Sequence, residues 1–335
     1  MTEPTPTQIA LFYDGFEMKA REGFTGAAYS NGRRALRYAY RAARGRQVHT
    51  GFYTAFRGLV ASLRSRGVKV RINDFAFARA HPDDPVGIAG YPSVLDHVDL
   101  PNPMIFGPGD YGASQKAVVI ANRPNIKILT QPCAWAVAFN QRWVGDKGAV
   151  YFAGIDTNAW PDLSDQAKSV DFLVYDKIRW YRPERTQTVL NRCLAELDAR
   201  GLTYRVLRYG EHHIGQFRTA LAQSRAMLFL CEHETQGLAY QEAMSSGVPV
   251  LAWDDGLLVD PQSLAMAPPG LTVSSVPYFD ARCGRTFKLD AFAETLDAFQ
   301  AEREGLDPRA FVLDELSLER SADVYLNLVR LAAKP

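Results

Sequence analysis

The chain has 335 residues, of which 47% are apolar and 22% are charged. This composition is that of a globular protein with room for two domains, and it excludes a disordered chain, a collagen-like fibre and a small disulfide scaffold. The four cysteines lie far apart in the sequence, which favours ordinary buried thiols. No apolar stretch approaches the roughly 20 residues that would span a bilayer.

Positive charge is concentrated in one segment of the chain. The net charge is only +1, yet residues 19–71 hold thirteen Lys and Arg and a single acid, Glu22. Such an excess indicates an anionic partner. The first residues lack the basic and long apolar regions of a signal peptide, so we expect a cytoplasmic protein whose membrane contact, if any, is peripheral at the inner face.

Short apolar runs typical of strands alternate with helical patterns along the chain. The first series of strand candidates is 9–13, 68–72, 103–106, 117–119, 126–129 and 150–152, and the second is 171–175, 204–208, 226–230, 248–253 and 271–273. Helical patterns cover 51–66, 186–200, 214–223 and 240–245. This alternation predicts an α/β protein with parallel sheets.

A polar stretch with many turn-forming residues, 156–165, separates the two series. We therefore expect two α/β domains with a cleft between them, where ligands of such sheets bind. No GxGxxG follows a strand and no GxxxxGK[ST] occurs in the sequence. A nicotinamide-dependent dehydrogenase and a P-loop ATPase are therefore disfavoured.

The most informative segment is 227–253, which is typical of a buried strand, a polar loop, a helix opening at Gly237 and a turn into another strand. Gly237 has no Cβ and allows a ligand to approach the backbone. The free N–H groups of the following turn, at Leu238 and Ala239, form an anion site.

Two glutamates bracket this turn. Glu234 precedes the helix, and Glu242 lies within it, about 7–8 Å from Gly237 along the axis. Carboxylates accept paired hydrogen bonds from neighbouring hydroxyls. A diphosphate at the helix N-terminus would then have a sugar near one glutamate and a ribose near the other.

The pattern around these glutamates resembles the donor motif of retaining glycosyltransferases of the GT-B fold, family 4. The matching residues are Glu234, Gly237, Leu238, Glu242, Ala243, Met244, Gly247, Pro249 and Val250. Looser similarities cover 51–68, 154–160 and 317–326. The resemblance implies two Rossmann-like domains facing a cleft: an acceptor-side domain at 1–160 and a nucleotide-sugar-binding domain at 161–315. It also implies a closing helix within 316–335 that packs back on the first domain.

The same resemblance implies a function. A sugar would pass from a nucleotide diphosphate sugar to an acceptor hydroxyl with retention of anomeric configuration, as in cell-surface glycan or glycolipid assembly. Glu234 would orient the transferred sugar, Glu242 would bind the ribose, and Lys177 would stabilise the departing diphosphate. The further donor-site candidates are Thr235, Gln236, Gly237, Leu238, Ala239, Arg179, Arg182 and Tyr209. The family's usual glycine before the basic loop is absent here, and Thr235-Gln236 replaces its common pair.

A basic helix is predicted within residues 33–44. Its arginines recur at helical spacing, and Leu36, Tyr40 and Ala43 fall on another stripe; the arginines are Arg33, Arg34, Arg37, Arg41 and Arg44, of which the first four are the candidates for the acceptor or membrane side. Such a helix either lies on anionic lipid headgroups or presents a solvated face. The resemblance places the acceptor on this domain, so we expect an anionic glycan or a lipid-linked saccharide. No metal-ligand spacing and no nucleic-acid module is present, and we expect no bound metal, no other cofactor and no nucleic-acid partner.

Other functions stay open on the sequence alone. A sugar-nucleotide epimerase or a phosphorylase could use the same fold. A non-catalytic protein could bind a nucleotide sugar or an anionic glycan.

Overall fold

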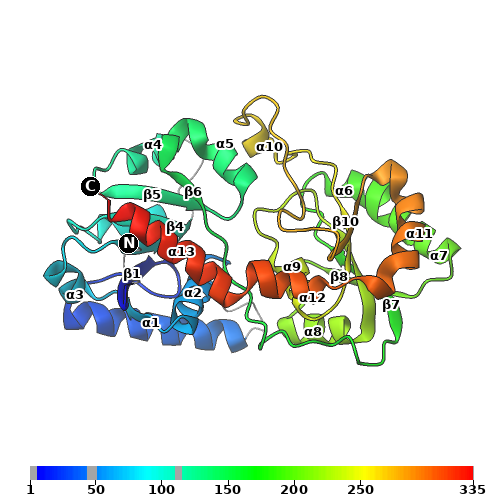
Figure 1. Cartoon of the computed structure of the whole chain (residues 1–335), viewed down its shortest axis with the longest axis horizontal. Coiled ribbons are helices and arrows are strands. Elements are labelled where there is room, and N and C mark those ends of the chain that lie inside the picture. Colours follow the sequence, from blue (N-terminus) through cyan, green and yellow to red (C-terminus); the bar gives the residue numbers. More distant parts are fainter. Residues whose placement is uncertain (1–5, 44–50, 110–114, 335) are drawn as a thin grey trace. The chain divides into compact units, whose positions relative to one another are not determined.

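The computed structural model describes residues 6–43, 51–109 and 115–334. The chain divides into two compact units (Figure 1). The first comprises Met1–Gly154 and Leu318–Pro335, and the second is Ile155–Ser317. The sequence suggested boundaries after residues 160 and 315.

The first unit is built on a parallel sheet. Within its described residues, the order β2-β1-β3-β4-β5-β6 is formed by β1 (Gln8–Asp14), β2 (Lys69–Ile72), β3 (Val86–Gly90), β4 (Met104–Gly109), β5 (Ile126–Gln131) and β6 (Gly148–Val150). Its helices are α1 (Gly23–Ala43), α2 (Gly51–Ser65), α3 (Phe75–Ala80), α4 (Gln115–Ala121), α5 (Ala134–Val144) and α13 (Leu318–Ala332).

Helices cover both faces of this sheet. On one face, Phe56 and Leu59 of α2 and Tyr325 of α13 pack against the strands. On the other face, α3 and α4 supply Phe75 and Ile120. Helix α13 follows the second unit in sequence but completes the core of the first, which confirms the predicted closing helix.

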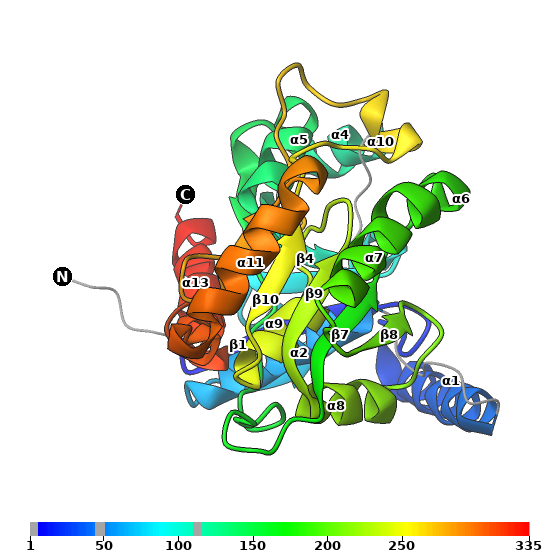
Figure 2. The ribbon, with the colours of Figure 1, turned by 90° about the vertical axis from the view of Figure 1, so that its right-hand side faces the viewer.

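The second unit has its own parallel sheet, whose strands lie side by side in Figure 2. Within the described residues, the order β11-β10-β9-β7-β8 is formed by β7 (Val170–Asp176), β8 (Tyr204–Arg208), β9 (Ser224–Leu230), β10 (Val250–Trp253) and β11 (Gly284–Phe287). Its helices are α6 (Arg182–Arg185), α7 (Asn191–Ala199), α8 (Ile214–Gln223), α9 (Leu238–Ser245), α10 (Pro261–Leu264), α11 (Phe292–Glu302) and α12 (Pro308–Phe311).

The predicted fold class is confirmed: both units are α/β with parallel sheets. Two predicted strands are wrong. Residues 117–119 lie in α4, where Ala117, Ile120 and Ala121 are buried at a helical spacing. Residues 271–273 lie in irregular chain, and the sheet is extended instead by β11.

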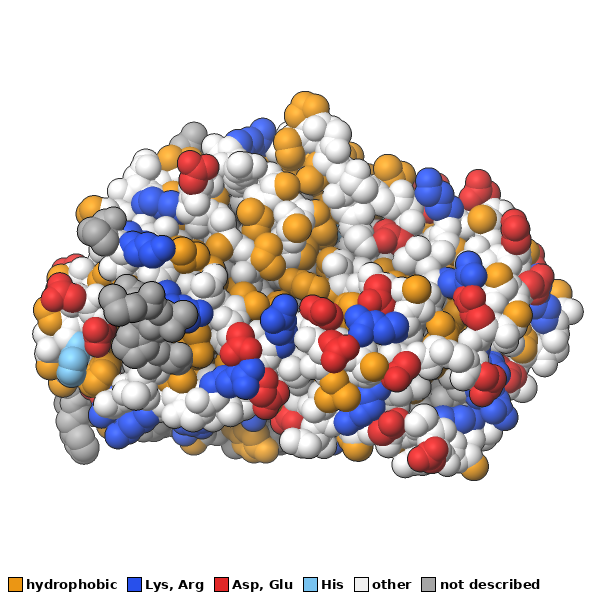
Figure 3. Space-filling view, viewed as in Figure 1, with side chains coloured by type: hydrophobic (Ala, Val, Ile, Leu, Met, Phe, Trp, Pro, Cys, Tyr) orange, Lys and Arg blue, Asp and Glu red, His pale blue; other side chains and the backbone are white. Residues whose placement is uncertain are grey.

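The surface of the second unit mixes charges of both signs. On the face shown in Figure 3, acidic and basic side chains are interspersed over this unit. Among the described residues, no helix combines the length and apolar character needed to cross a membrane.

Candidate active site

The site lies at the carboxyl edge of the second sheet. Strands β7 and β9 are parallel neighbours and end in register at Asp176 and Leu230. The backbone N–H of Lys177 donates to the carbonyl of Leu230 at 2.8 Å, so the loops that follow the two strands start side by side. The topology therefore brings the basic loop 177–182 against the glutamate-bearing loop 231–237.

Lys177 and Glu234 form an ion pair there. The Lys177 Nζ lies 2.6 Å from Glu234 Oε1, and both side chains are about nine-tenths buried (exposed fractions 11% and 9%). Burial alone would raise the pKa of Glu234, but Lys177 and Arg179 lower that pKa below its usual value. Burial opposes the charge of Lys177 as well, yet Glu234 raises the pKa of Lys177 above its usual value. Both groups are therefore charged at neutral pH.

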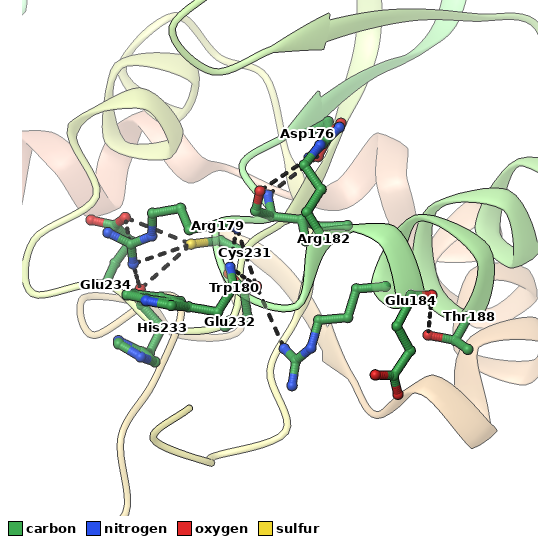
Figure 4. Close-up of polar contacts among 12 residues, drawn as sticks. Asp176, Arg179, Trp180, Arg182, Glu184, Thr188, Cys231, Glu232, His233 and Glu234 are labelled. Carbon is green, nitrogen blue, oxygen red and sulfur yellow. Dashed lines mark hydrogen bonds and ion pairs between the residues drawn. The ribbon is translucent and has the colours of Figure 1, made fainter. Parts of the chain in front are cut away.

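Arg179 joins this pair. Its Nη2 lies 3.4 Å from Glu234 Oε1 and also donates to the carbonyl of His233 (Figure 4). The Sγ of Cys231 lies 3.6 Å from Glu234 Oε1. One buried carboxylate thus faces two cations and a thiol.

A second buried carboxylate, Glu232, fixes the shape of the basic loop. It accepts hydrogen bonds from the backbone N–H groups of Arg179, at 3.2 Å, and of Trp180, at 3.1 Å. It also lies 3.5 Å from Arg185 Nη1. The sequence argument missed Glu232 and Arg185, because no local signal relates positions so far apart.

Arg182 is turned to a different carboxylate. Its Nη1 and Nη2 donate to the two oxygens of Asp176 at 3.0 and 2.5 Å, and Nη1 also donates to the carbonyl of Ile178 (Figure 4). The structure therefore brings Lys177 and Arg179 to Glu234 and holds Arg182 at Asp176. Arg182 shapes the loop from this position.

Tyr209 lies beside Lys177. The Lys177 Nζ is 4.5 Å from the centroid of the Tyr209 ring, and the N–H of Tyr209 donates to the carbonyl of Asp176 at 2.9 Å. The ring is half exposed, at 51%. Tyr209 thus presents an accessible aromatic face next to the ion pair.

Gly237 precedes α9 and has a φ of 80°, which favours glycine. A Cβ at this position would lie 2.2 Å from Cε1 of the buried Tyr240. The glycine is therefore required by packing as well as by backbone conformation. Leu238 and Ala239, in the first turn of α9, are half-buried.

The loop before Gly237 is only partly buried. Thr235 is exposed, and Gln236 is half-buried. The Gln241 side chain donates to the carbonyl of Gln236 at 2.9 Å. Gln241 thus holds the loop where it enters α9.

Glu242 differs from Glu234 in its charge. Burial raises the pKa of Glu242 to about 8, although Arg218 and Lys177 act in the opposite direction. At pH 7 this carboxyl is mostly protonated and can donate a hydrogen bond. The two glutamates of the motif therefore have different protonation states.

His233 forms an aromatic wall of the site with Trp180. The ring centroids are 4.5 Å apart and the planes are inclined by 20°. Burial, followed by the charge of Arg179, lowers the pKa of His233 to about 4, so this imidazole is neutral at pH 7. No pattern in the sequence indicated that Trp180 would lie at the site.

The carboxyl edge of the first sheet also holds charged side chains. Buried Asp14 accepts from Lys19 Nζ at 2.6 Å, and buried Glu17 accepts from the hydroxyl of Tyr13 at 3.0 Å. Arg37 of α1 lies 3.8 Å from Glu17. Arg33 and Arg34 are exposed, and the side chain of Arg41 lies outside the described part of the chain.

No metal centre accompanies these groups in the described part of the chain. Nowhere in it do three or more His, Cys, Asp or Glu side chains gather in a way that could hold a metal ion.

The sequence matches no protein-family model and no curated protein. Solved structures match the fold. The lipopolysaccharide outer core galactosyltransferase WaaB is 10% identical, with 96% of this chain and 99% of that chain covered and a TM-score of 0.50. Sucrose-phosphate synthase from Thermosynechococcus elongatus is 13% identical, with 97% and 98% covered and a TM-score of 0.50.

A third match is TarM of S. aureus, solved in complex with UDP. It is 13% identical, with a TM-score of 0.50. The match covers 76% of this chain but spans only 57% of the TarM chain. These neighbours are GT-B glycosyltransferases, and this chain has the GT-B fold.

Proposed function

We propose that the protein is a retaining glycosyltransferase of the family 4 type. It transfers a sugar from a nucleotide diphosphate sugar to an acceptor hydroxyl, with retention at the anomeric carbon, in the assembly of a cell-surface glycan or glycolipid. The observation that carries this proposal is the Lys177–Glu234 pair, formed by two separate loops beside the N-terminus of α9.

The charges around this pair suit a diphosphate. Lys177, Arg179, Arg182 and Arg185 face Asp176, Glu232 and Glu234. In this group the four cations outnumber the three carboxylates by one. The N–H groups of Leu238 and Ala239 add the positive end of α9. An anion that enters the site therefore gains charge-assisted hydrogen bonds.

We propose that the donor exchanges partners with the ion pair. When the diphosphate enters, Lys177 turns from Glu234 to the phosphate oxygens. Glu234 is then freed to accept hydrogen bonds from hydroxyls of the transferred sugar. This exchange ties the orientation of the sugar to the presence of the diphosphate.

Bond cleavage at the anomeric carbon puts negative charge on the departing diphosphate. Lys177, Arg179 and the α9 N–H groups stabilise that charge, and preorganised donors of this kind contribute about 10²–10³ each to the rate. No side chain is needed as a covalent nucleophile, because the leaving phosphate takes the proton of the acceptor. Glu242 binds the ribose, and Tyr209 lies on the nucleobase side.

The first unit receives the acceptor in this proposal. Its segment 19–71 carries thirteen basic residues and one acid, so the acceptor is an anionic glycan or a lipid-linked saccharide. We propose no resident metal or other cofactor for the reaction.

The test is a panel of nucleotide sugars carrying uridine, guanosine or adenosine diphosphate. Release of the free nucleoside diphosphate from one donor is expected, together with its loss in Lys177→Ala. Lys168→Ala is the matched control, because Lys168 precedes the opposite end of β7. Proton NMR of the product, or of the hydrolysed sugar at early times, reports the anomeric configuration.

Three results would overturn the proposal. The first is the absence of turnover with every donor when acceptors are supplied. The second is turnover that survives in Lys177→Ala. The third is inversion at the anomeric carbon, which would remove the retaining mechanism and keep the transferase. Interconversion of the nucleotide sugar without release of diphosphate would indicate an epimerase.

A further inference from the structure

Glu232 attaches the basic loop of the site to the glutamate-bearing loop. Its side chain is only 1% exposed and accepts hydrogen bonds from the backbone N–H groups of Arg179, at 3.2 Å, and of Trp180, at 3.1 Å (Figure 4). Both N–H groups donate to the same oxygen, Oε1. Hydrogen bonds to a charged acceptor are stronger than those between neutral groups. The backbone of the basic loop is therefore fixed at these two residues.

Arg179 is held at its side chain as well as at its backbone. Its Nη2 donates to the carbonyl of His233, and its guanidinium carbon lies 4.2 Å from the centroid of the Trp180 ring. The Trp180 ring itself stacks on His233. Nη2 also lies 3.4 Å from Glu234 Oε1. With Glu232 on its backbone N–H, Arg179 has one well-determined position beside Glu234.

Lys177 is attached more loosely to the same carboxylate. Its Nζ lies 2.6 Å from Glu234 Oε1 and 4.5 Å from the centroid of the Tyr209 ring. A lysine ammonium is a point charge on a flexible four-carbon stem, whereas a guanidinium is a planar group with several donors. Of the two cations at Glu234, Lys177 is the one that can turn to a phosphate, and Arg179 is the one that stays.

The exchange of partners in the proposed reaction needs a cation that stays. When Lys177 turns to the diphosphate, Glu234 loses its nearest positive charge. A buried carboxylate without a cation is strongly destabilised. Lys177, Arg179 and the Cys231 thiol face Glu234, so Arg179 is the charge that remains.

We propose that Glu232 is a positioning residue of the transfer reaction. It holds Arg179 against Glu234, so that Glu234 stays ionised and oriented toward the sugar while Lys177 serves the diphosphate. This inference rests on the proposed function and assigns a role to a residue that the donor motif does not include.

Arg185 offers a second explanation for the buried carboxylate. Its Nη1 lies 3.5 Å from Glu232 Oε1, so Glu232 also balances this charge. Glu232→Gln separates the two roles. Its amide oxygen still accepts hydrogen bonds from the N–H groups of Arg179 and Trp180, but it has no charge for Arg185.

The experiment measures kcat with the nucleotide sugar that wild type turns over, well below the melting transition of each variant. In Glu232→Ala, kcat should fall by about tenfold or more, because a small displacement of a catalytic group is costly. Glu232→Gln should retain most of the activity. Affinity for the corresponding free nucleoside diphosphate should change less than kcat, since Lys177 is still present.

The pH dependence of kcat distinguishes positioning from a general loss of stability. Lys177 and Arg179 lower the pKa of Glu234 below its usual value. Once Arg179 is displaced, this pKa rises, and the ionised carboxylate is lost at a higher pH. The acidic limb of the profile should therefore shift to higher pH in Glu232→Ala and stay in place in Glu232→Gln.

Asp171→Ala is the matched control. Asp171 also accepts a hydrogen bond from a backbone N–H, that of Thr203 at 2.9 Å, but it lies at the opposite, amino end of β7. Its loss should lower stability and leave both kcat and the pH profile as in wild type. Amide hydrogen exchange should become faster at Arg179 and Trp180 in Glu232→Ala and stay unchanged there in Asp171→Ala.

Arg179→Ala keeps the inference testable if Glu232→Ala does not fold. This variant removes the cation that Glu232 holds, so the acidic limb should shift in the same direction. An unshifted limb in Arg179→Ala would overturn the inference.

Other results would also overturn it. One is a wild-type kcat and pH profile in Glu232→Ala. Another is an equal loss in Glu232→Gln and Glu232→Ala, which would assign the effect to the charge that faces Arg185. A third is the same loss in Asp171→Ala. Each of these leaves the proposed function standing, whereas failure of wild type to turn over any donor overturns that function before a variant is made.

Discussion

The loop after β7 and helix α1 each carry several cations within a short stretch of chain. In the loop and in α6, which follows it, Lys177, Arg182 and Arg185 each have a buried carboxylate within 4 Å. In α1, Arg33 and Arg34 have none among the described residues. The cations of the first region have their counter-charges within the same unit, whereas Arg33 and Arg34 have no carboxylate partner among the described residues. A count of basic residues alone does not separate these two uses.

The largest effect should come from Lys177→Ala. If Lys177 stabilises the departing diphosphate as proposed, removing its charge should lower turnover by about 10²–10³. The measurement is kcat for nucleotide release, made after circular dichroism has established folding. Arg34→Ala is the comparison in the other cationic region. Because the proposal places the acceptor on that segment, its effect should appear in the KM for an anionic acceptor, and kcat should equal that of wild type. Equal losses would contradict the contrast between the two regions.

The next effect concerns stability. Glu232→Ala removes a buried carboxylate and leaves the N–H groups of Arg179 and Trp180 and the charge of Arg185 without it. The free energy of unfolding should fall by about 3 kcal/mol. Glu302→Ala breaks the exposed pair with Arg285 and should cost less than about 1 kcal/mol. Urea denaturation measures both, and similar values would show that burial of Glu232 contributes little.

A smaller effect should appear in the pH dependence of nucleotide binding. The pKa of Glu242 is about 8, and the ionised form is the one that accepts hydrogen bonds from two ribose hydroxyls. Binding should therefore release a proton below pH 8. Affinity for the nucleoside diphosphate should rise by up to about tenfold per pH unit toward pH 8 and level off above it.

Calorimetry between pH 6.5 and 9 measures this slope. Glu242→Gln keeps the shape of the side chain but cannot titrate. The pH dependence of affinity that remains in this variant therefore comes from other groups, such as the phosphate of the nucleotide. The same slope in wild type and variant would exclude Glu242 as the titrating group. Glu234→Ala should not weaken binding of the free nucleoside diphosphate, because the proposed exchange makes Glu234 a competitor of the diphosphate for Lys177.

The smallest effect should come from Arg34→Ala in the absence of lipid. Its side chain is exposed and has no carboxylate partner among the described residues. The free energy of unfolding should change by less than about 0.5 kcal/mol. A larger loss in urea denaturation would mean that α1 uses this charge within the protein, as it uses Arg37.

The strand, glycine turn and helix within 227–253 were predictable because their signal is continuous in sequence. Strand β9, Gly237 and α9 lie within one short segment. The positive φ at position 237 favours glycine, so the turn into α9 is visible in the sequence. The strand predicted at 117–119 was wrong because a short apolar run fits a strand or a buried helix equally well. The burial of Ala117, Ile120 and Ala121, whose spacing identifies α4 as a helix, depends on packing against the sheet and cannot be seen in the sequence.

The ion pairs of the basic loop were beyond sequence reasoning for another reason. Glu232 and Arg185 are distant in sequence, and each residue type has many possible partners. Their pairing follows from the register of β7 against β9, which places Asp176 opposite Leu230. Similarly, the spacing of Arg37 among the arginines of α1 did not reveal that it faces Glu17.

The position of α13 has a consequence for folding during synthesis. The second unit is an uninterrupted stretch, and its ends meet: the N–H of Ile155 donates to the carbonyl of Leu316 at 2.8 Å, and Ile155 bridges Ser317. The first unit lacks Tyr325, Leu326 and Val329 of its core until α13 has been synthesised. The unit whose synthesis starts first is therefore the one that completes its core last, after the second unit has all of its own residues.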